Sequence, residues 1–188
     1  LLAPDHRRYW QLIAAELQRY GANTLASLVR LGQGVTYREI LVDVCDKLDV
    51  NYNQKSTTET IELALLMKVL EKNLDQMTPE ELAAFSRNMH LALTTPTPQL
   101  ILIAVQAAIR TSSLAALELA TVLSASVITS LGGVATWGTV VVASRALSVI
   151  SGPVAIALSS AWMISDIAGP AYRVTIPACI IVAWLRQQ

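Results

Sequence analysis

Charge is scarce in the second half of this chain. After residue 90 only six charged side chains occur: Arg110, Glu118, Arg145, Asp166, Arg173 and Arg186. Glu118 and Arg145 are separated by 26 residues without a charge. An ordinary domain spreads charge over its whole surface. The scarcity therefore predicts that this half is buried, takes part in an oligomer or contacts a membrane.

The residue types that carry most enzyme and metal chemistry are also scarce. The two cysteines, Cys45 and Cys179, are too few and too far apart in sequence for a disulfide framework or a zinc site. We expect both to be buried free thiols. His6 and His90 fall near predicted helix ends, and no nucleophile elbow or phosphate-binding glycine loop occurs. The sequence thus indicates no catalytic site, no metal site and no cofactor, and an enzyme is the least favoured class.

Net charge and the first residues exclude further classes. The formal net charge is zero, so the chain lacks the basic footprint of a nucleic-acid-binding protein. Residues 1–8 lack the basic region followed by an apolar stretch that defines a signal peptide. The sequence also begins without Met, which indicates a fragment or a processed form. With 188 residues, of which 53% are hydrophobic, we expect one domain with a sizeable core.

Amphipathic helices account for the first half. Three capping boxes, each a Ser or Thr followed three residues later by Glu, start at Thr36, Ser56 and Thr78. Apolar stripes at helical spacing follow these boxes, and no segment alternates with period two. Residues 1–93 are interpreted as charged amphipathic helices and residues 99–188 as uncharged apolar helices, with a proline-rich seam between them. The prediction is an all-α bundle of about seven to nine helices that packs as one domain.

The long uncharged run predicts an apolar helical hairpin over about residues 113–150, near the centre of the bundle. Gly132-Gly133 would form its turn, and Glu118 and Arg145 would form an ion pair at its open end. Each arm is then roughly 20 Å long, which is shorter than the ~30 Å hydrocarbon core of a bilayer. Three interpretations stay open: a buried hairpin of a soluble protein, conditional or stable membrane contact, and an oligomer contact. The membrane-inserting candidates are Leu119, Val122, Leu123, Val127, Ile128, Trp137, Val140, Val141 and Val142.

Three carboxylates recur on one predicted helix. Asp43, Asp46 and Asp49 have the spacing i, i+3, i+6, which brings them toward one side. A cation site is one interpretation of this spacing. A solvated helix face is the favoured one, because the loop of a calcium-binding EF-hand is absent.

Isolated polar and aromatic residues mark the uncharged half. Arg173 has to reach water or find an acceptor, and we expect it to pair with Asp166 or with carboxylates of the first half. Such a pair would tie the tail to the first helices. The tryptophans Trp137, Trp162 and Trp184 suit either a core or a membrane interface, and the core is favoured.

Both ends of the chain contain familiar stretches. Residues 9–18 (YWQLIAAELQ), 37–44 (YREILVDV) and 171–178 (AYRVTIPA) resemble the YaaW family of bacterial proteins, some relatives of which are labelled ubiquinol-cytochrome c chaperone-like. The resemblance implies a bacterial source and a helical fold, and it implies no mechanism. The middle of the chain, residues 56–144, resembles the family poorly, which indicates that the hairpin is specialised in this member. The matched positions to test first are Trp10, Arg38, Asp43, Tyr172 and Arg173.

The uncharged hairpin decides the functional hypotheses. The first is a membrane-active helical domain, a pore-forming-like bacterial toxin or effector module that inserts residues 113–150 into a bilayer. The alternative is a soluble helical protein-binding or chaperone-type module, whose apolar half is a core or a partner interface. The partner is accordingly a lipid bilayer or a helical protein, and oligomerisation is compatible with both. The expected location is the bacterial cytoplasm or the membrane, since this chain shows no signal peptide.

Overall fold

Helices make up most of the structure, a computed structural model. It describes residues 11, 12, 15, 35–112, 115–117, 119–121, 123 and 172–186, with the backbone alone for residue 173. Five helices have their bounds in these ranges: α3 (Tyr37–Lys47), α4 (Thr58–Leu74), α5 (Pro79–Asn88), α6 (Pro98–Thr111) and α11 (Tyr172–Arg186). The described residues contain no strand, so the predicted helical class is confirmed for them.

The number of helices is smaller than predicted in this part of the chain. Besides the five bounded helices, helical residues occur at 115–117, 119–121 and 123, and at 11, 12 and 15. The predicted seven to nine helices are therefore not reached within the described ranges. Apart from its first positions, the predicted hairpin over residues 113–150 lies outside the described residues. The last helix begins at Tyr172, and Pro177 lies inside it.

Two of the predicted capping boxes are confirmed. At the start of α3, the Thr36 hydroxyl accepts a hydrogen bond from the Glu39 backbone N–H (3.3 Å), and the Thr36 N–H donates to the Glu39 carboxylate (2.7 Å). Thr78 and Glu81 form the same pair at the start of α5, with distances of 3.3 and 2.8 Å. Each box satisfies backbone N–H groups that have no partner inside the helix.

The second capping box was predicted wrongly, by one residue. Helix α4 begins after Thr57, whose hydroxyl accepts a hydrogen bond from the Thr60 N–H (3.3 Å). Thr60 therefore stands at the third position of the helix, where a capping box needs Glu. Glu59 stands one position earlier, and its carboxylate pairs with Arg186 at the end of α11.

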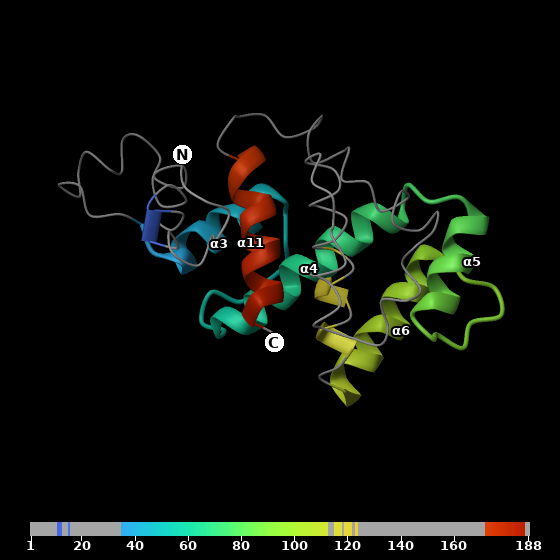
Figure 1. Ribbon diagram of the computed structural model, residues 1–188. Coiled ribbons are helices and arrows are strands. Elements are labelled where there is room, and N and C mark those ends of the chain that lie inside the picture. The colour runs from blue at the N-terminus through green and yellow to red at the C-terminus, as the bar shows by residue number, and fades with distance from the viewer. Residues whose placement is uncertain are drawn as a thin grey trace.

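The core forms where α11 packs against α3 and α4. Figure 1 shows α11 beside α3 and against α4, with α5 and α6 toward the other end of α4. Helix α6 packs on α4, and its residues Ile101 and Val105 are buried in the core. The stripes predicted for α3 and α4 are confirmed as core. The buried side chains at the centre are Ile40, Val44, Cys45, Ile61, Leu65, Leu66, Val69, Ile176, Cys179, Ile180 and Ala183.

The first positions of the predicted hairpin belong to this core. Leu119 and Leu123 are buried, as is Ala120. The Trp184 indole N–H donates a hydrogen bond to the Thr121 hydroxyl (3.0 Å), which links this segment to α11. Trp184 is thus a core residue, as favoured from the sequence, whereas Trp137 and Trp162 lie outside the described residues.

Of the nine membrane-inserting candidates, two are described by the structure and seven are not. Leu119 and Leu123 are core residues here, with exposed fractions of 0% and 1%. Among the described residues, no helix combines the length and the apolar character that a membrane crossing requires. The other candidates lie outside the described residues: Val122, Val127, Ile128, Trp137, Val140, Val141 and Val142.

The second residue after α3 and the second residue after α5 have a left-handed backbone conformation. Asp49 follows α3 with φ 54°, and His90 follows α5 with φ 52°. After each, the chain closes a Schellman motif: the Val50 N–H donates to the Cys45 carbonyl and the Leu91 N–H to the Ser86 carbonyl, both at 2.9 Å. Glycine is the usual residue here, because a Cβ atom raises the energy of this conformation.

Replacing Asp49 or His90 by Gly is therefore expected to raise the free energy of unfolding by about 0.5–1 kcal/mol each. Asp75, the residue after α4, provides the control, since its backbone is right-handed (φ −64°). Asp75→Gly should lower the free energy of unfolding. Urea titration of the three variants measures the effect, and a change of the same sign in Asp49→Gly and Asp75→Gly would contradict the explanation.

Candidate functional site

Arg38 holds the loop between α3 and α4. Its guanidinium donates hydrogen bonds to the carbonyl oxygens of Gln54 (2.7 Å) and Ser56 (2.8 Å) and to the Thr58 hydroxyl (3.2 Å). A planar guanidinium can satisfy several acceptors at once, which an ammonium group does less well. Arg38, singled out from the family resemblance, thus has a structural position at the entry to α4.

Asp43 and Tyr172, the next two of those positions, are brought together from opposite ends of the chain. Asp43 lies on α3 and Tyr172 is the first residue of α11. Burial raises the pKa of the Tyr172 hydroxyl, and the charge of Asp43 and a hydrogen bond to it raise that pKa further. The Lys47 ammonium lies 5.4 Å from the centre of the Tyr172 ring, in a cation–π contact. These contacts attach the start of α11 to α3.

Asp46 and Asp49, the other two carboxylates of the predicted triplet, lie in different surroundings. Asp46 accepts a hydrogen bond from the Tyr52 hydroxyl (2.7 Å). Asp49 occupies the left-handed position after α3 and is exposed. The described residues contain no group of three or more carboxylate, Cys or His side chains suited to a metal ion. The triplet is therefore interpreted as separate helix and loop contacts.

Several predicted site residues lie outside the described part. Trp10, Glu118 and Arg145 are not described, and neither is the side chain of Arg173. The hairpin ion pair between Glu118 and Arg145 accordingly stays a prediction. The same holds for a role of Arg173 in tying the tail to the first half.

Arg186 provides such a tie at the other end of α11. Its guanidinium pairs with the exposed Glu59 and with Glu62, whose carboxylate oxygen Oε1 lies 3.1 Å from Arg186 Nε. Glu62 is fully buried, and this oxygen forms no hydrogen bond of good geometry. Burial raises the pKa of the Glu62 carboxyl, while Tyr37 and Arg186 lower it in part. A half-exposed cation thus compensates a carboxylate inside the core.

Tyr37 and the two cysteines complete the polar groups of this interface. The Tyr37 hydroxyl donates to the Cys179 carbonyl (3.5 Å), and burial is the main reason why its pKa is raised. Cys45 and Cys179 are free and buried, as predicted. Burial raises the pKa of Cys45 to about 12 and that of Cys179 also well above its usual value. Thiols of this kind are protonated and unreactive, so this cluster is structural.

A groove between α4 and α6 is the candidate binding site. It has a volume of about 540 Å³ and adjoins the loop after α3. Lys68 and Glu71 on its rim pair with each other (2.7 Å), whereas Asp49 and Arg110 have no side-chain partner within the part of the chain that the structure describes. The apolar lining comes from Val50, Leu63, Ala64, Met67, Leu102, Ile103 and Ile109.

The groove and the Glu62–Arg186 pair were not found from the sequence. One signal for Glu62 was available: it precedes Leu66 by four residues, so it shares the buried side of α4 with Leu66 and Leu65. A carboxylate on such a stripe needs a partner, and Arg186 is one of the few cations of the second half. The groove had no comparable signal, because it depends on how α6 crosses α4.

Comparison with known proteins gives the family of this chain. A UPF0174 protein of Helicobacter pylori (strain J99) is 43% identical over 185 residues, which cover 97% of this chain and 72% of that protein. The UPF0174 protein YaaW of Escherichia coli (strain K12) is 32% identical over 183 residues, covering 97% of this chain and 73% of the relative. The chain belongs to the UPF0174 family. The resemblance to YaaW is thereby confirmed, and the relatives support the predicted bacterial origin.

A second UPF0174 protein of Helicobacter pylori (strain J99) is also similar to this chain. It is 35% identical over 190 residues, which cover 98% of this chain and 90% of the relative. No family model matches the chain. No solved structure matches it either.

Removing the cation beside Glu62 should destabilise the protein in a pH-dependent way. Arg186→Met keeps the aliphatic stem and leaves the buried carboxylate unpaired, so we expect a loss of about 2–3 kcal/mol at neutral pH. The folded-state pKa of Glu62 is raised, so the folded variant takes up a proton that the unfolded chain does not. The deficit should therefore shrink as the pH is lowered below neutral.

Urea titrations at several pH values measure this effect. Adding Glu62→Gln to Arg186→Met serves as the control, because a neutral amide cannot carry the buried charge. The double variant should recover most of the lost stability and lose the pH dependence. A deficit that is the same at every pH would show that Arg186 stabilises the fold by packing and not by its charge.

The Arg38 contacts predict a local effect. Arg38→Ala should lower the free energy of unfolding by about 1–2 kcal/mol, since three hydrogen bonds to a charged donor are lost. Amide hydrogen exchange should rise at residues 54–58, while Arg38→Lys should fall between the two. Lys55→Ala on the same loop is the matched control, with an expected change below about 0.5 kcal/mol. Equal effects of Arg38→Ala and Lys55→Ala would refute the assignment.

Proposed function

We propose that this protein is a helical protein-binding module, and that its binding surface is the outer face of α6 together with the groove between α4 and α6. A protein-binding module is one of the two functions that the amino-acid sequence favours. The support comes from the chemistry of α6 and of the groove beside it.

The observation that carries the proposal is that α6 leaves two large apolar side chains exposed. Ile101 and Val105 are buried in the core, whereas Ile103 is 63% and Leu100 44% exposed, among polar side chains of the same helix. No acidic residue occurs in the whole helix. Large apolar side chains that are exposed to water gain free energy when a partner covers them.

The groove adds the features of a contact site. Its lining is mainly apolar, with charged groups at the rim. Binding surfaces commonly combine an apolar centre with a polar rim, because the centre supplies the hydrophobic free energy and the rim sets the orientation. Ile103 belongs both to the exposed face and to the groove, so the two form one continuous surface.

Membrane insertion of residues 113–150 remains an untested prediction. Its first part would have to withdraw Leu119 and Leu123 from the core, at a cost of roughly 2 kcal/mol for each side chain. It would also break the hydrogen bond between Trp184 and Thr121. The outer face of α6 can bind a partner without any of these losses, and for this reason we favour protein binding.

Site-specific crosslinking in bacterial cells tests the proposal. A benzoylphenylalanine at position 103 should give a defined protein adduct on illumination, because this position lies in the contact surface. The same group at position 87, in place of the exposed Arg87 on α5, is the control and should give little adduct. Equal labelling at the two positions, or adducts with lipid alone at position 103, would refute protein binding, and lipid adducts would favour membrane contact.

A further inference from the structure

We propose that the partner of the α6 surface is a second copy of this chain, related to the first by a two-fold axis. This inference rests on the proposed protein-binding function and specifies the partner. A two-fold contact uses the same patch on both copies, so that patch must be complementary to itself. The surface between α4 and α6 meets this requirement in shape and in charge.

The shape is complementary because one surface carries both a projection and a hollow. Ile103 is the most exposed large hydrophobic side chain among the described residues, at 63%. It stands at the groove of about 540 Å³ that lies between α4 and α6. In a two-fold arrangement, Ile103 of each copy enters the groove of the other, and both projections are covered at once.

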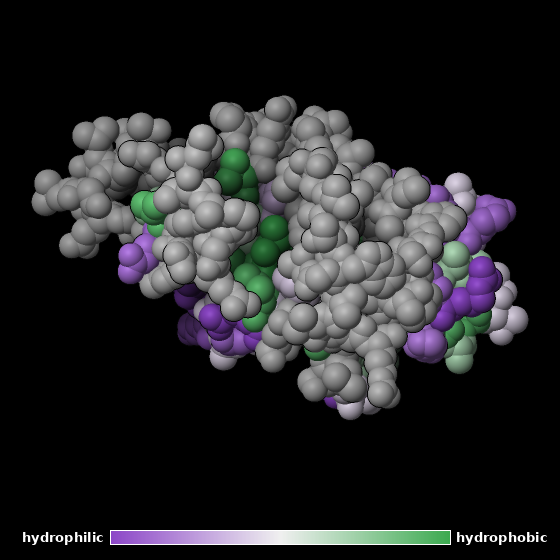
Figure 2. Space-filling model, in the orientation of Figure 1, coloured by the Kyte–Doolittle hydropathy of each residue, from purple (hydrophilic) through white to green (hydrophobic). Residues whose placement is uncertain are grey.

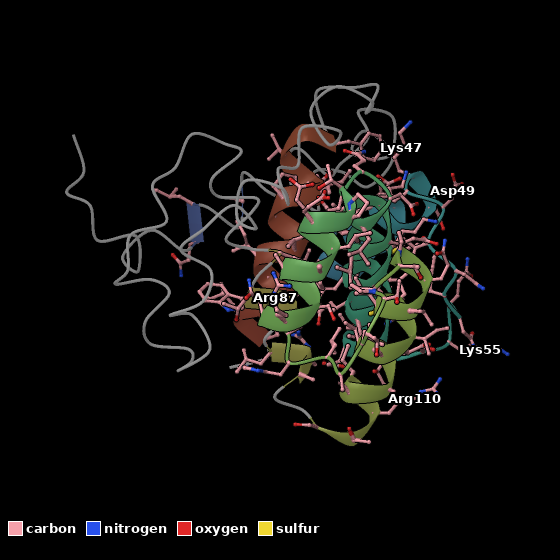
Figure 3. All side chains as sticks on the ribbon, turned by 90° about the vertical axis from the view of Figure 1, so that its right-hand side faces the viewer. Lys47, Asp49, Lys55, Arg87 and Arg110 are labelled. Carbon is pink, nitrogen blue, oxygen red and sulfur yellow. The ribbon has the colours of Figure 1, made fainter. Side chains whose placement is uncertain are left out.

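The charges of the groove are complementary to themselves as well. Asp49 and Arg110 both line it, and neither has a side-chain partner among the described residues. In Figure 3 both residues lie in the right-hand part of the view, Asp49 above and Arg110 below, and Arg87 lies farther to the left. A two-fold axis sets Arg110 against the partner's Asp49 and repeats this pair by symmetry.

A different protein would have to bring its own acid and base at matching positions. A second copy supplies them without further conditions, and its formal net charge of zero causes no overall repulsion. Opposite charges that face each other across an interface fix its orientation and favour association. For these reasons the groove favours self-association over a partner of one charge sign.

Sedimentation equilibrium of the full chain tests the proposal through a charge exchange. The unaltered chain should form a concentration-dependent dimer. Arg110→Asp and Asp49→Arg should each weaken it by about tenfold or more, because each sets like charges against each other. The combined variant Asp49→Arg/Arg110→Asp should return to within about threefold of the unaltered chain, since the pairs are restored with exchanged signs.

Two further variants complete the design. Ile103→Glu should give monomers, because a carboxylate cannot enter the apolar groove. Arg87→Asp is the matched control: like Arg110, Arg87 is an arginine in the last turn of its helix, but it does not line the groove, so dimerisation should not change. Circular dichroism melts of all variants verify that loss of the dimer is not loss of the fold.

The outcomes separate this inference from the function on which it rests. A monomer at all concentrations overturns self-association, and so does a combined variant as weak as the single ones. Dimers that tolerate Ile103→Glu also overturn it. If the chain is monomeric while position 103 still crosslinks to a protein of another mass, the binding function stands and the choice of partner is wrong. If position 103 crosslinks to no protein, both fail.

Discussion

The contact of α11 with α3 and α4 is the constraint on which the described core depends. Helix α11 comes from the end of the chain, yet Ile176, Cys179, Ile180 and Ala183 are fully buried against the two earlier helices. At its start, Tyr172 meets Asp43 and Lys47. At its end, Arg186 pairs with Glu59 and the buried Glu62. Polar contacts at both ends therefore set the position of an apolar helix that could otherwise slide or rotate in the core.

The scarcity of charge after residue 90 has two different consequences in the described part. In α11, the scarcity of charge allows the side that faces α3 and α4 to be buried. Figure 2 shows hydrophobic surface where Figure 1 places this helix, and Val174 and Leu185 are exposed there. In α6, Leu100 and Ile103 stay exposed, and Ile103 lines the groove. The first consequence concerns stability and the second concerns binding, and composition by itself does not distinguish them.

Local rules explain which predictions succeeded. The capping boxes at Thr36 and Thr78 involve residues three positions apart, so no distant group is needed to form them. The apolar stripes of α3 and α4 likewise follow from the helical repeat. The box at Ser56 failed because Thr57, the next residue, caps α4, so that Thr60 and not Glu59 stands at the third helical position. Three hydroxyl residues follow one another here, and spacing alone does not choose between them.

The candidate site was less predictable than the helices. The resemblance singled out Arg38, Asp43 and Tyr172, and the structure gives each of them contacts that organise the packing of α3, α4 and α11. None of them lines the groove. The groove combines the loop after α3 with α4 and α6, and its shape depends on a crossing of helices that periodicity does not encode.

The amino-acid sequence by itself determined the helical class, the caps at Thr36 and Thr78, the buried stripes and the UPF0174 membership. These depend on short-range backbone hydrogen bonding, on the periodicity of the helix and on the order of residues along the chain. Only the tertiary structure decided that Glu62 is compensated by Arg186, that Leu119 and Leu123 belong to the core, and that Ile103 of α6 is exposed beside a groove. These depend on which distant surfaces exclude water from one another, and that follows from the packing of whole helices.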